Sequence, residues 1–515
     1  MEVRAWAWAS IMTVVLVVLT ILRRDRGSQP QGNRLPPGPK PWPVIGNLNL
    51  IGALPHRSIH ELSKQYGPLM QLRFGSFPVV VGSSAEMARF FLKTQDTVFA
   101  DRPRTAAGKY TTYNYSDVLW APYNAHFRHA RKLFATELFS TARLDSYKHI
   151  RHEEVSALLR DLAVHGTSGR VVQLRGYLFA ATNGIISRVV LGKKYADKDA
   201  RGSAAMPLED LSGLIEEFFL LNGVINVGDF IPWLNWLDLQ GYVGRMKKYS
   251  KKMDLFLEHV LEEHEKRRHV EGEQFVARDM VDVLMQLADN PNRIDRNTVK
   301  ALTQELIVGG SDTSSVTIEW AMSEVVRNPE VLGKATKELD CVVGRDRMVM
   351  EKDIPELPYI EAIVKEAMRM HPVSPMLAPH LAREDAYVDG HAIRAGTLVL
   401  VNVWAIGRDP TRWDAPDEFR PERFIGSKVD VKGQDMELLP FGAGRRMCPG
   451  YSLGLKMVQL IVANLLHGFA WGLPDGMAPE QLSMEEIYGL TTARRFPLEA
   501  VVKPKLPVPA HLFSC

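Results

Sequence analysis

The sequence predicts a mainly α-helical fold with minor β-sheets, built as one large domain behind an N-terminal transmembrane helix. Three observations predict it: an uncharged apolar run at residues 5–22, amphipathic stretches such as residues 254–268, and only short β-branched runs at residues 79–81 and 397–401. Of the 515 residues, 46% are hydrophobic and 24% are charged, which allows a large core and gives no sign of disorder. No internal repeat or low-complexity tract divides the chain after residue 47.

The first element is the apolar run AWAWASIMTVVLVVLTIL at residues 5–22. As a helix it spans roughly 27 Å, close to the hydrocarbon thickness of an endoplasmic reticulum membrane. Arg23, Arg24 and Arg26 follow where a signal peptide would carry a small-residue cleavage site, so a membrane anchor over residues 1–26 is favoured over a signal peptide. The positive-inside rule then predicts a single-pass protein of the endoplasmic reticulum membrane, with the rest of the chain in the cytosol.

A linker and a proline-rich hinge follow at residues 27–47. The segment LPPGPKPWPVIGN, residues 35–47, contains five prolines, which fix φ and remove backbone donors. It can therefore neither extend the anchor helix nor join a central strand. We interpret it as a stiff spacer; the alternative, a proline-rich ligand for another domain, is disfavoured because apolar residues resume at once. Residues 48–515 are then expected to form one large domain.

Charge and cysteine content exclude several classes of protein. The net charge of +3 and the absence of a long Lys/Arg tract argue against nucleic acid as a partner. The three cysteines, Cys341, Cys448 and Cys515, are not closely spaced, so neither a disulfide framework nor a CxxC metal site is predicted. Cys341 is expected to be a small core residue and Cys515 a residue of the free terminus.

The strongest motif is FGAGRRMCPG at residues 441–450, which fits the spacing FxxGxRxCxG. The fitting residues are Phe441, Gly444, Arg446, Cys448 and Gly450. This motif resembles the cysteine loop of cytochromes P450. The resemblance implies the P450 fold with haem b between distal and proximal helices, Cys448 as the thiolate ligand of the iron, and Phe441 and Arg446 at the cofactor. A thiolate ligand favours O–O cleavage, and Arg446 would pair with a haem propionate.

Two further segments match P450 signatures that hold the haem-binding core. Glu366 and Arg369 form an ExxR pair on one helix face, and Arg423 lies in the later segment Pro421-Glu-Arg-Phe424. Without the resemblance, an ExxR pair would be an exposed helix pair of little energetic value. The resemblance implies a buried network of the three charged side chains.

The segment GGSDTS at residues 309–314 lies within an apolar helical stretch that begins near Asn297 and cannot continue past Pro329. Two glycines and a buried acid inside a helix are locally unfavourable, which calls for a packing or functional reason. The resemblance supplies one, because it makes this the distal helix, with room for O₂ at the glycines. It assigns Thr313 and Asp312 to oxygen activation and proton delivery.

A third match covers residues 123–133, which resemble the helix whose WxxxR residues contact haem propionates. Phe127 stands where tryptophan is usual, so an indole N–H to a propionate is lost, while Arg131 keeps its place. His380 falls where relatives often place a cation on a propionate, and a hydrogen-bonded core histidine is the equal alternative.

The chain has no GxGxxG segment after a strand and no length left for a flavin domain, so electrons must come from another protein. The resemblance implies NADPH-cytochrome P450 reductase, which would dock on a basic proximal face. Candidate residues for that face are Arg128, Arg131, Lys132 and Arg445.

By motif position, the residues expected to contact a small lipophilic substrate are Leu306, Gly310, Val373, Leu377 and Leu490. The motifs resemble those of plant microsomal A-type members, which implies specialised metabolism. Apolar segments around residues 218–221 and 228–241 favour a terpenoid, including an acyclic terpene alcohol that is hydroxylated or cleaved to a homoterpene. A flavonoid or phenylpropanoid ring is the alternative substrate. A haem-thiolate isomerase is disfavoured by Asp312 and Thr313, and a non-catalytic anchored protein of the same fold would bind no haem.

Overall fold

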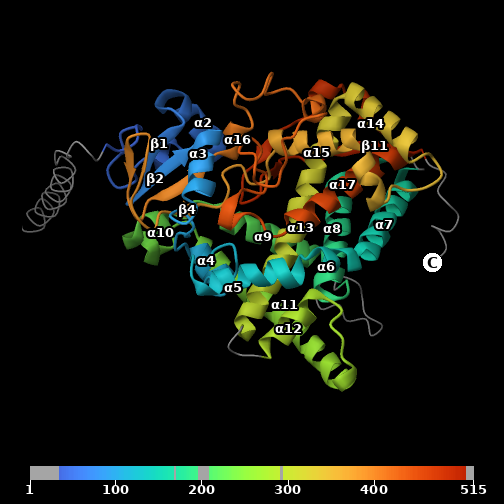
Figure 1. The fold of residues 1–515 in the computed structure, drawn as a ribbon, viewed down its shortest axis with the longest axis horizontal. Helices are drawn as coiled ribbons and strands as arrows, with labels where there is room; N and C mark the ends of the chain where they lie inside the picture. The colour runs from blue at the N-terminus through green and yellow to red at the C-terminus, as the bar shows by residue number, and fades with distance from the viewer. Residues whose placement is uncertain (1–33, 167–169, 195–207, 290–293, 506–515) are drawn as a thin grey trace, which may run out of the picture.

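The computed structural model describes residues 34–166, 170–194, 208–289 and 294–505 (Figure 1). The membrane helix expected at residues 5–22 lies outside the described residues, as does Cys515. The described chain is mainly helical with small sheets, so the predicted fold class is confirmed.

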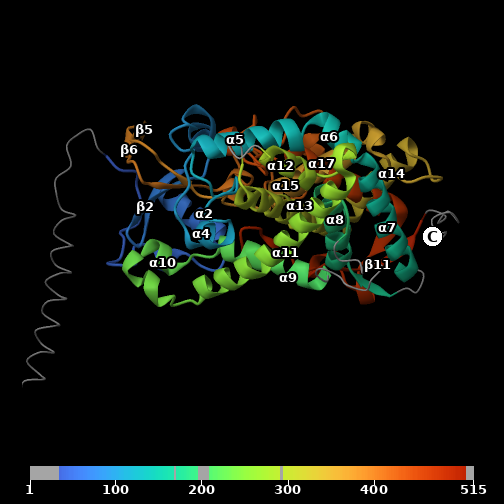
Figure 2. The ribbon, with the colours of Figure 1, turned by 90° about the horizontal axis from the view of Figure 1, so that it is seen from below.

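The longer α-helices are α2 (Pro55–Tyr66), α5 (Ala125–Leu133), α7 (Lys148–Gly166), α8 (Leu174–Leu191), α9 (Leu208–Gly223), α11 (Tyr242–Glu271), α12 (Met280–Ala288), α13 (Arg296–Arg327), α14 (Pro329–Val342), α15 (Pro358–Met370) and α17 (Tyr451–Gly468). The shorter ones are α3 (Ala85–Arg89), α4 (Ala106–Thr111), α6 (Thr141–Ser146), α10 (Val227–Phe230) and α16 (Val403–Ile406). Figures 1 and 2 both show α13 passing through the middle of the molecule, with α7 and α14 toward one end.

The position of α13 follows from its caps and its packing. The Asp295 side chain accepts a hydrogen bond from the Thr298 N–H at 2.8 Å and begins the helix, and Pro329 ends it. The helix boundaries predicted from the sequence therefore hold. The helix packs against α8, α15 and α17. Its contact with α8 is so close that a Cβ on Gly310 would lie 2.4 Å from Ile186 Cδ1.

The largest sheet has the strand order β1-β2-β7-β4, and only the β2–β7 pair is parallel. Its strands are β1 (Leu69–Phe74), β2 (Phe77–Gly82), β7 (Leu398–Val401) and β4 (His380–Leu381). The other sheets are formed by β3 (Val171–Gln173), β11 (Glu499–Pro504) and β8 (Phe469–Gly472), by β5 (Ala386–Val388) and β6 (His391–Ile393), and by β9 (Glu486–Ile487) and β10 (Ala493–Arg494). The two strands expected from β-branched runs are neighbours, because Val79 pairs with Leu398.

The described part of the proline hinge lies along edge strand β1, where prolines are tolerated. The Gln71 N–H donates to the Pro37 carbonyl at 2.8 Å, and a Cβ on Gly38 would lie 1.9 Å from the Gln71 carbonyl oxygen. The hinge is thus held against the sheet by its backbone.

Two features of the helices bear on the predictions. Cys341, expected in the core, is exposed near the end of α14, because it lies on the helix face turned away from the buried residues Ala335 and Leu339. Among the described residues, the stretch Asp210–Phe230 is long and apolar enough to cross a membrane, but 44% of its apolar window is buried within the fold.

Candidate active site

A cavity of about 310 Å³ lies between α13, the loop at residues 440–450 and the start of α17. Most residues that the sequence assigned to the site line it: Phe127, Arg131, Leu306, Gly310, Thr313, Val373, Leu377, His380, Phe441, Arg446, Cys448 and Leu490. The assigned residues that do not line it are Asp312, Glu366, Arg369 and Arg423. The fold thus brings together residues from five separate stretches of the chain.

Cys448 lies in a tight loop whose backbone is fixed on both sides. Its N–H donates to the Phe441 carbonyl at 2.9 Å. Gly444 has φ +65°, and a Cβ there would lie 1.8 Å from the Leu92 carbonyl oxygen, so only glycine fits. Burial raises the pKa of the Cys448 thiol, whereas a hydrogen bond from the Gly450 N–H and the charge of Arg131 lower it. The loop therefore presents the Cys448 sulfur to the cavity. The Gly450 N–H is its hydrogen-bond donor, and Arg131 is the cation nearby.

Two arginines approach the same cavity from α5 and from the cysteine loop. Arg131 Nη1 donates to the Met447 carbonyl at 2.7 Å. The Arg446 guanidinium donates to three backbone carbonyls, those of Ala100, Val118 and Ala121, at 2.6, 3.1 and 2.6 Å. It also lies 3.8 Å from the centre of the buried Phe127 ring. Since a guanidinium has five N–H bonds, Arg446 keeps two for another partner.

His380 is both buried and part of the cavity wall. Its Nδ1 lies 2.8 Å from the Phe99 carbonyl oxygen. Burial and the nearby charge of Arg102 hold the pKa of His380 well below its usual range, so the imidazole is neutral. With its single N–H donated to Phe99, His380 keeps only an acceptor for the cavity. This arrangement matches the core-histidine alternative better than a cation on a propionate.

Arg102 lines the cavity and was not expected from the sequence. Its side chain is 5% exposed and donates to the carbonyls of Leu119, Ala378 and Pro379 at 2.9, 2.7 and 2.7 Å. These partners lie up to 277 positions away along the chain, so no motif or periodicity marks the residue. Arg102 brings a third guanidinium to this wall, beside those of the half-buried Arg131 and Arg446.

Some residues around Thr313 on α13 line the cavity, and others pack the helix against its neighbours. The Thr313 hydroxyl lines the cavity and donates to the Gly309 carbonyl at 2.7 Å. A Cβ on Gly309 would meet no atom within 4 Å, so this glycine leaves open space. Gly310 also lines the cavity, and it lets α13 pack closely against Ile186, because an added Cβ would lie 2.4 Å from Ile186 Cδ1. The Asp312 side chain points elsewhere, because successive helical residues differ by about 100° around the axis.

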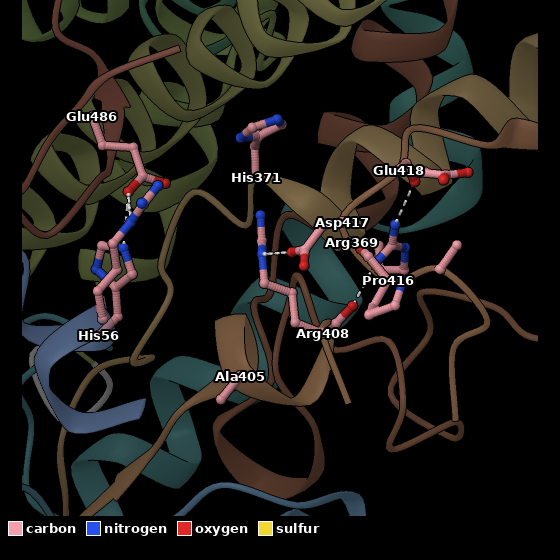
Figure 3. Close-up of polar contacts among 12 residues, drawn as sticks. His56, Arg369, His371, Ala405, Arg408, Pro416, Asp417, Glu418 and Glu486 are labelled. Atoms are coloured by element: carbon pink, nitrogen blue, oxygen red, sulfur yellow. Dashed lines mark hydrogen bonds and ion pairs between the residues drawn. The ribbon is translucent and has the colours of Figure 1, made fainter. Parts of the chain in front are cut away.

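Glu366, Arg369 and Arg423 meet in a hydrogen-bonded network that does not line the cavity. Figure 3 shows Arg369 of this network beside Pro416 and Glu418. Glu366 accepts hydrogen bonds from Arg369 Nε at 2.7 Å and from Arg423 Nε at 2.9 Å. Arg369 also donates to the carbonyls of Gly407, Pro416 and Glu418, so its guanidinium ties α15 to the loop that precedes the cysteine segment. Glu366 and Arg369 are fully buried, and their charges are therefore compensated within this network.

Comparisons with known proteins identify the family of this site. The sequence profile of the family described as Cytochrome P450 matches residues 36–496. The chain belongs to the cytochrome P450 family. It is 49% identical over 530 residues to trimethyltridecatetraene synthase of Zea mays, covering 98% of this chain and 94% of that protein. It is 45% identical over 487 residues to flavonoid 3'-monooxygenase of Petunia hybrida, covering 93% and 94%.

A solved structure supports the same conclusion about the fold. The zebra fish cytochrome P450 with progesterone superimposes on this P450 with a TM-score of 0.74 at 28% identity. The match covers 88% of this chain and 100% of that chain. The protein is thus a plant-type cytochrome P450 monooxygenase, and the family implies a haem-thiolate cofactor.

The cavity of this P450 fits such a cofactor by charge. Burial lowers the pKa of Arg102 and of Arg131, and it lowers the pKa of Arg446 to about 10, so each cation lacks a full anionic partner. Two acids share the wall, but burial raises the pKa of Asp117 to about 7 and of Glu305 to about 8. Near neutral pH these acids compensate the arginines only in part. A dianion such as the propionate pair of haem would complete the balance.

The remaining walls of the P450 cavity are apolar. Three helices contribute apolar side chains to these walls: α8 with Ile186 and Val190, α9 with Phe218 and Phe219, and α13 with Leu306. Leu377 takes part with an unusual backbone, since its φ is +52°. The aromatic pair of α9 is buried in the core and also lines the cavity.

Proposed function

We propose that this P450 holds haem b with the Cys448 thiolate as iron ligand and oxidises a small lipophilic terpenoid. The observation that carries the proposal is that Cys448, Thr313 and three arginines, one buried and two half-buried, line one cavity from separate elements. When bound, haem with a thiolate ligand supplies the reductive activation of O₂. The residues described below hold the group and manage protons and substrate.

The arginines would hold the propionates. Arg446 retains two N–H bonds, and Arg131 and Arg102 add buried charge on the same wall. Phe127, in place of the usual tryptophan, contributes a flat apolar surface under Arg446 rather than an N–H. The charge-assisted contacts of the arginines then replace the missing indole donor.

Thr313 and Asp312 would manage protons. The Thr313 hydroxyl faces the cavity beside the open space at Gly309. Burial raises the pKa of Asp312 to about 6, so this acid can both hold and release a proton near neutral pH. We expect Thr313→Ala to raise NADPH use without product; unchanged coupling would show that another group delivers the protons.

The substrate class rests on the cavity walls and on the relatives. Much of the cavity wall is formed by aliphatic and phenyl side chains, which suit a largely apolar substrate. The relative with 49% identity carries the name of a methyl-branched tetraene. We infer an acyclic terpene alcohol as substrate, with hydroxylation or oxidative C–C cleavage to a homoterpene as the reaction.

A flavonoid ring hydroxylation is the second candidate. It is favoured by the 45% identity to a flavonoid 3'-monooxygenase and by the acceptor Nε2 of His380 on the cavity wall. Product analysis with reductase, NADPH and matched panels of acyclic terpene alcohols and flavonoids separates the two. Turnover of flavonoids alone would overturn the terpenoid proposal.

The haem ligand is tested by Cys448→Ala. The reduced, CO-treated wild-type protein should give the long-wavelength Soret band of a thiolate ligand, and the variant should lack it while remaining folded. A wild-type protein that folds but binds no haem would instead support the non-catalytic alternative.

The cellular setting is a proposal of the same kind. We infer an endoplasmic reticulum anchor at residues 5–22 with a cytosolic catalytic domain that receives electrons from NADPH-cytochrome P450 reductase. The sequon Asn114-Tyr-Ser116 supports a simple test, because Asn114 is exposed. In this topology Asn114 stays unglycosylated in microsomes. A shift in the electrophoretic mobility of the protein after glycosidase treatment would contradict the cytosolic placement.

A further inference from the structure

The Asp312 carboxyl has a partner far along the chain. Thr491 Oγ1 donates a hydrogen bond to Asp312 Oδ2 at 3.0 Å, across a sequence separation of 179 residues. Thr491 lines the cavity, whereas Asp312 does not. The Thr491 hydroxyl therefore stands between the cavity and the acid.

Thr491 is held in place by the backbone on both sides of it. The Leu490 N–H donates to the Phe219 carbonyl of α9 at 3.0 Å, and the Thr492 N–H donates to the Val373 carbonyl at 2.7 Å. Trp320 Nε1 of α13 donates to the Thr492 carbonyl at 3.1 Å. The loop between β9 and β10 is thus tied to the helix that carries Asp312, and the Thr491 hydroxyl has little freedom to move.

The acid has charged neighbours on three helices. Glu216 of α9 and Glu319 of α13 raise the pKa of Asp312, and Arg175 of α8 lowers it. Glu216 is exposed, and the Arg175 side chain is 30% exposed. The carboxyl is therefore placed between the solvent side of α8 and α9 and the cavity side of α13.

The Asp312 carboxyl is hydrogen-bonded to Thr491, whereas the Thr313 hydroxyl donates within its own helix. The Thr313 hydroxyl is bonded to the Gly309 carbonyl of its own helix. Within the described residues, the side-chain donor to the Asp312 carboxyl is Thr491. Among the described residues, the Asp312 carboxyl is therefore hydrogen-bonded to a cavity residue through Thr491.

We propose that Thr491 is a positioning residue for proton delivery, whose hydroxyl fixes the Asp312 carboxyl and links it to the cavity that Thr491 lines. In the transfer, the protonated Asp312 carboxyl donates to Thr491 Oγ1, the reverse of the hydrogen bond that the carboxylate accepts, and Thr491 releases its own hydroxyl proton to a cavity water. The hydroxyl is regenerated, and the carboxylate regains its proton from the solvent side. This inference rests on the proposed function, because it concerns how Asp312 serves the same site.

The test compares three variants of the full-length, haem-loaded protein with its reductase. Thr491→Val keeps the shape and removes the hydroxyl, Thr491→Ser keeps the hydroxyl, and Thr492→Val is the control. The control is matched because Thr492 Oγ1 is buried with no hydrogen-bond partner among the described residues. Product formed per NADPH should fall about fivefold in Thr491→Val, the factor for one neutral hydrogen bond, and stay unchanged in the others.

Two further readouts separate positioning from a merely structural role. The infrared band of the protonated Asp312 carboxyl, assigned by its loss in Asp312→Asn, should titrate at higher pH in Thr491→Val. The reason is that the lost hydrogen bond stabilised the carboxylate. Substrate affinity, measured by the change in haem absorption on binding, should remain within about twofold of the wild type, because the loop stays tied by its backbone.

Each outcome has a definite meaning. If Thr313→Ala uncouples the enzyme but Thr491→Val keeps wild-type coupling and the same carboxyl titration, the inference is overturned and the proposed function stands. If neither Thr313→Ala nor Asp312→Asn alters coupling, the proposed proton delivery fails instead. Should Thr491→Val lose its haem, Thr491→Ala replaces it, and equal coupling in Thr491→Ala and Thr491→Ser overturns the inference.

Discussion

At the scale of single residues, Glu305 stands out as a buried acid that carries out no step assigned above. Its carboxyl accepts the Val118 N–H at 2.7 Å and so ties α13 to the loop before α5. Burial, followed by the nearby charge of Asp117, raises the pKa of Glu305 from 4.5 to about 8. The protonated form is thus the one that the fold accommodates.

The raised pKa of Glu305 predicts how stability changes with pH. Its contribution is complete below pH 4.5, the ordinary pKa of the group, and is lost as pH rises through about 8. Glu305→Gln keeps an acceptor for Val118 and cannot ionise. Its stability relative to the wild type should therefore grow by about 1–3 kcal/mol between about pH 5 and about pH 8.

Thermal unfolding across this pH range measures the effect. Glu480→Gln, a change at an exposed position, is the control and should follow the wild type. Parallel curves for Glu305→Gln and the wild type would show that the Glu305 carboxylate is compensated in the folded protein.

At the scale of elements, α13 carries two adjacent glycines with different structural roles. Gly309 faces open space, whereas Gly310 lets α13 approach α8, since an added Cβ would lie 2.4 Å from Ile186 Cδ1. Glycine in a helix interior costs roughly 1 kcal/mol relative to alanine. The helix tolerates that cost at each position for a separate reason.

The pair allows a matched experiment on α13. Gly310→Ala should destabilise the protein by about 1–3 kcal/mol through overpacking against Ile186. Gly309→Ala should leave stability equal or higher by up to about 1 kcal/mol while placing a methyl group in the cavity. Denaturant unfolding gives both values.

A second-site change checks the cause. Ile186→Val removes the Cδ1 atom that lies nearest to the added Cβ and should recover part of the loss in Gly310→Ala. No recovery would place the strain in the α13 backbone instead of at this contact.

At the scale of the whole molecule, the proposed docking of a reductase depends on exposed basic residues of the expected proximal face. Of the four basic residues expected on it, Arg128, Lys132 and Arg445 are exposed, but Arg131 is turned inward to the Met447 carbonyl. Arg445 is already paired with Asp96 at 3.1 Å. Arg128 and Lys132 of α5 are therefore the better candidates for contact with an acidic reductase.

Charge reversal tests this face. The double change Arg128→Glu and Lys132→Glu should raise the reductase concentration for half-maximal turnover about tenfold at low salt, with the difference shrinking as salt screens the charges. Lys337→Glu on α14, away from α5 in both overall views, is the control. An equal effect from the control would mean that net charge matters rather than this face.

Much of the fold and part of the site follow from local pattern. The boundaries of α13 follow from the sequence because a capping acid and a proline act on neighbouring residues. The cysteine loop was recognisable because the residues of its motif, including Cys448, lie within ten positions of one another. Cys341 was placed wrongly, since the face of α14 that is buried depends on which helices pack against it.

The sequence by itself determined the helical class of this P450, the Cys448 loop and the charged pairs of the core, because each depends on residues close together or on a fixed motif. Only the tertiary structure decided that Asp312 is hydrogen-bonded to Thr491, that Arg102 lines the cavity and that His380 is buried against the Phe99 carbonyl. Those properties depend on burial and on hydrogen bonds between segments up to 281 positions apart. No periodicity along the chain encodes such contacts, since each is set by how the elements pack.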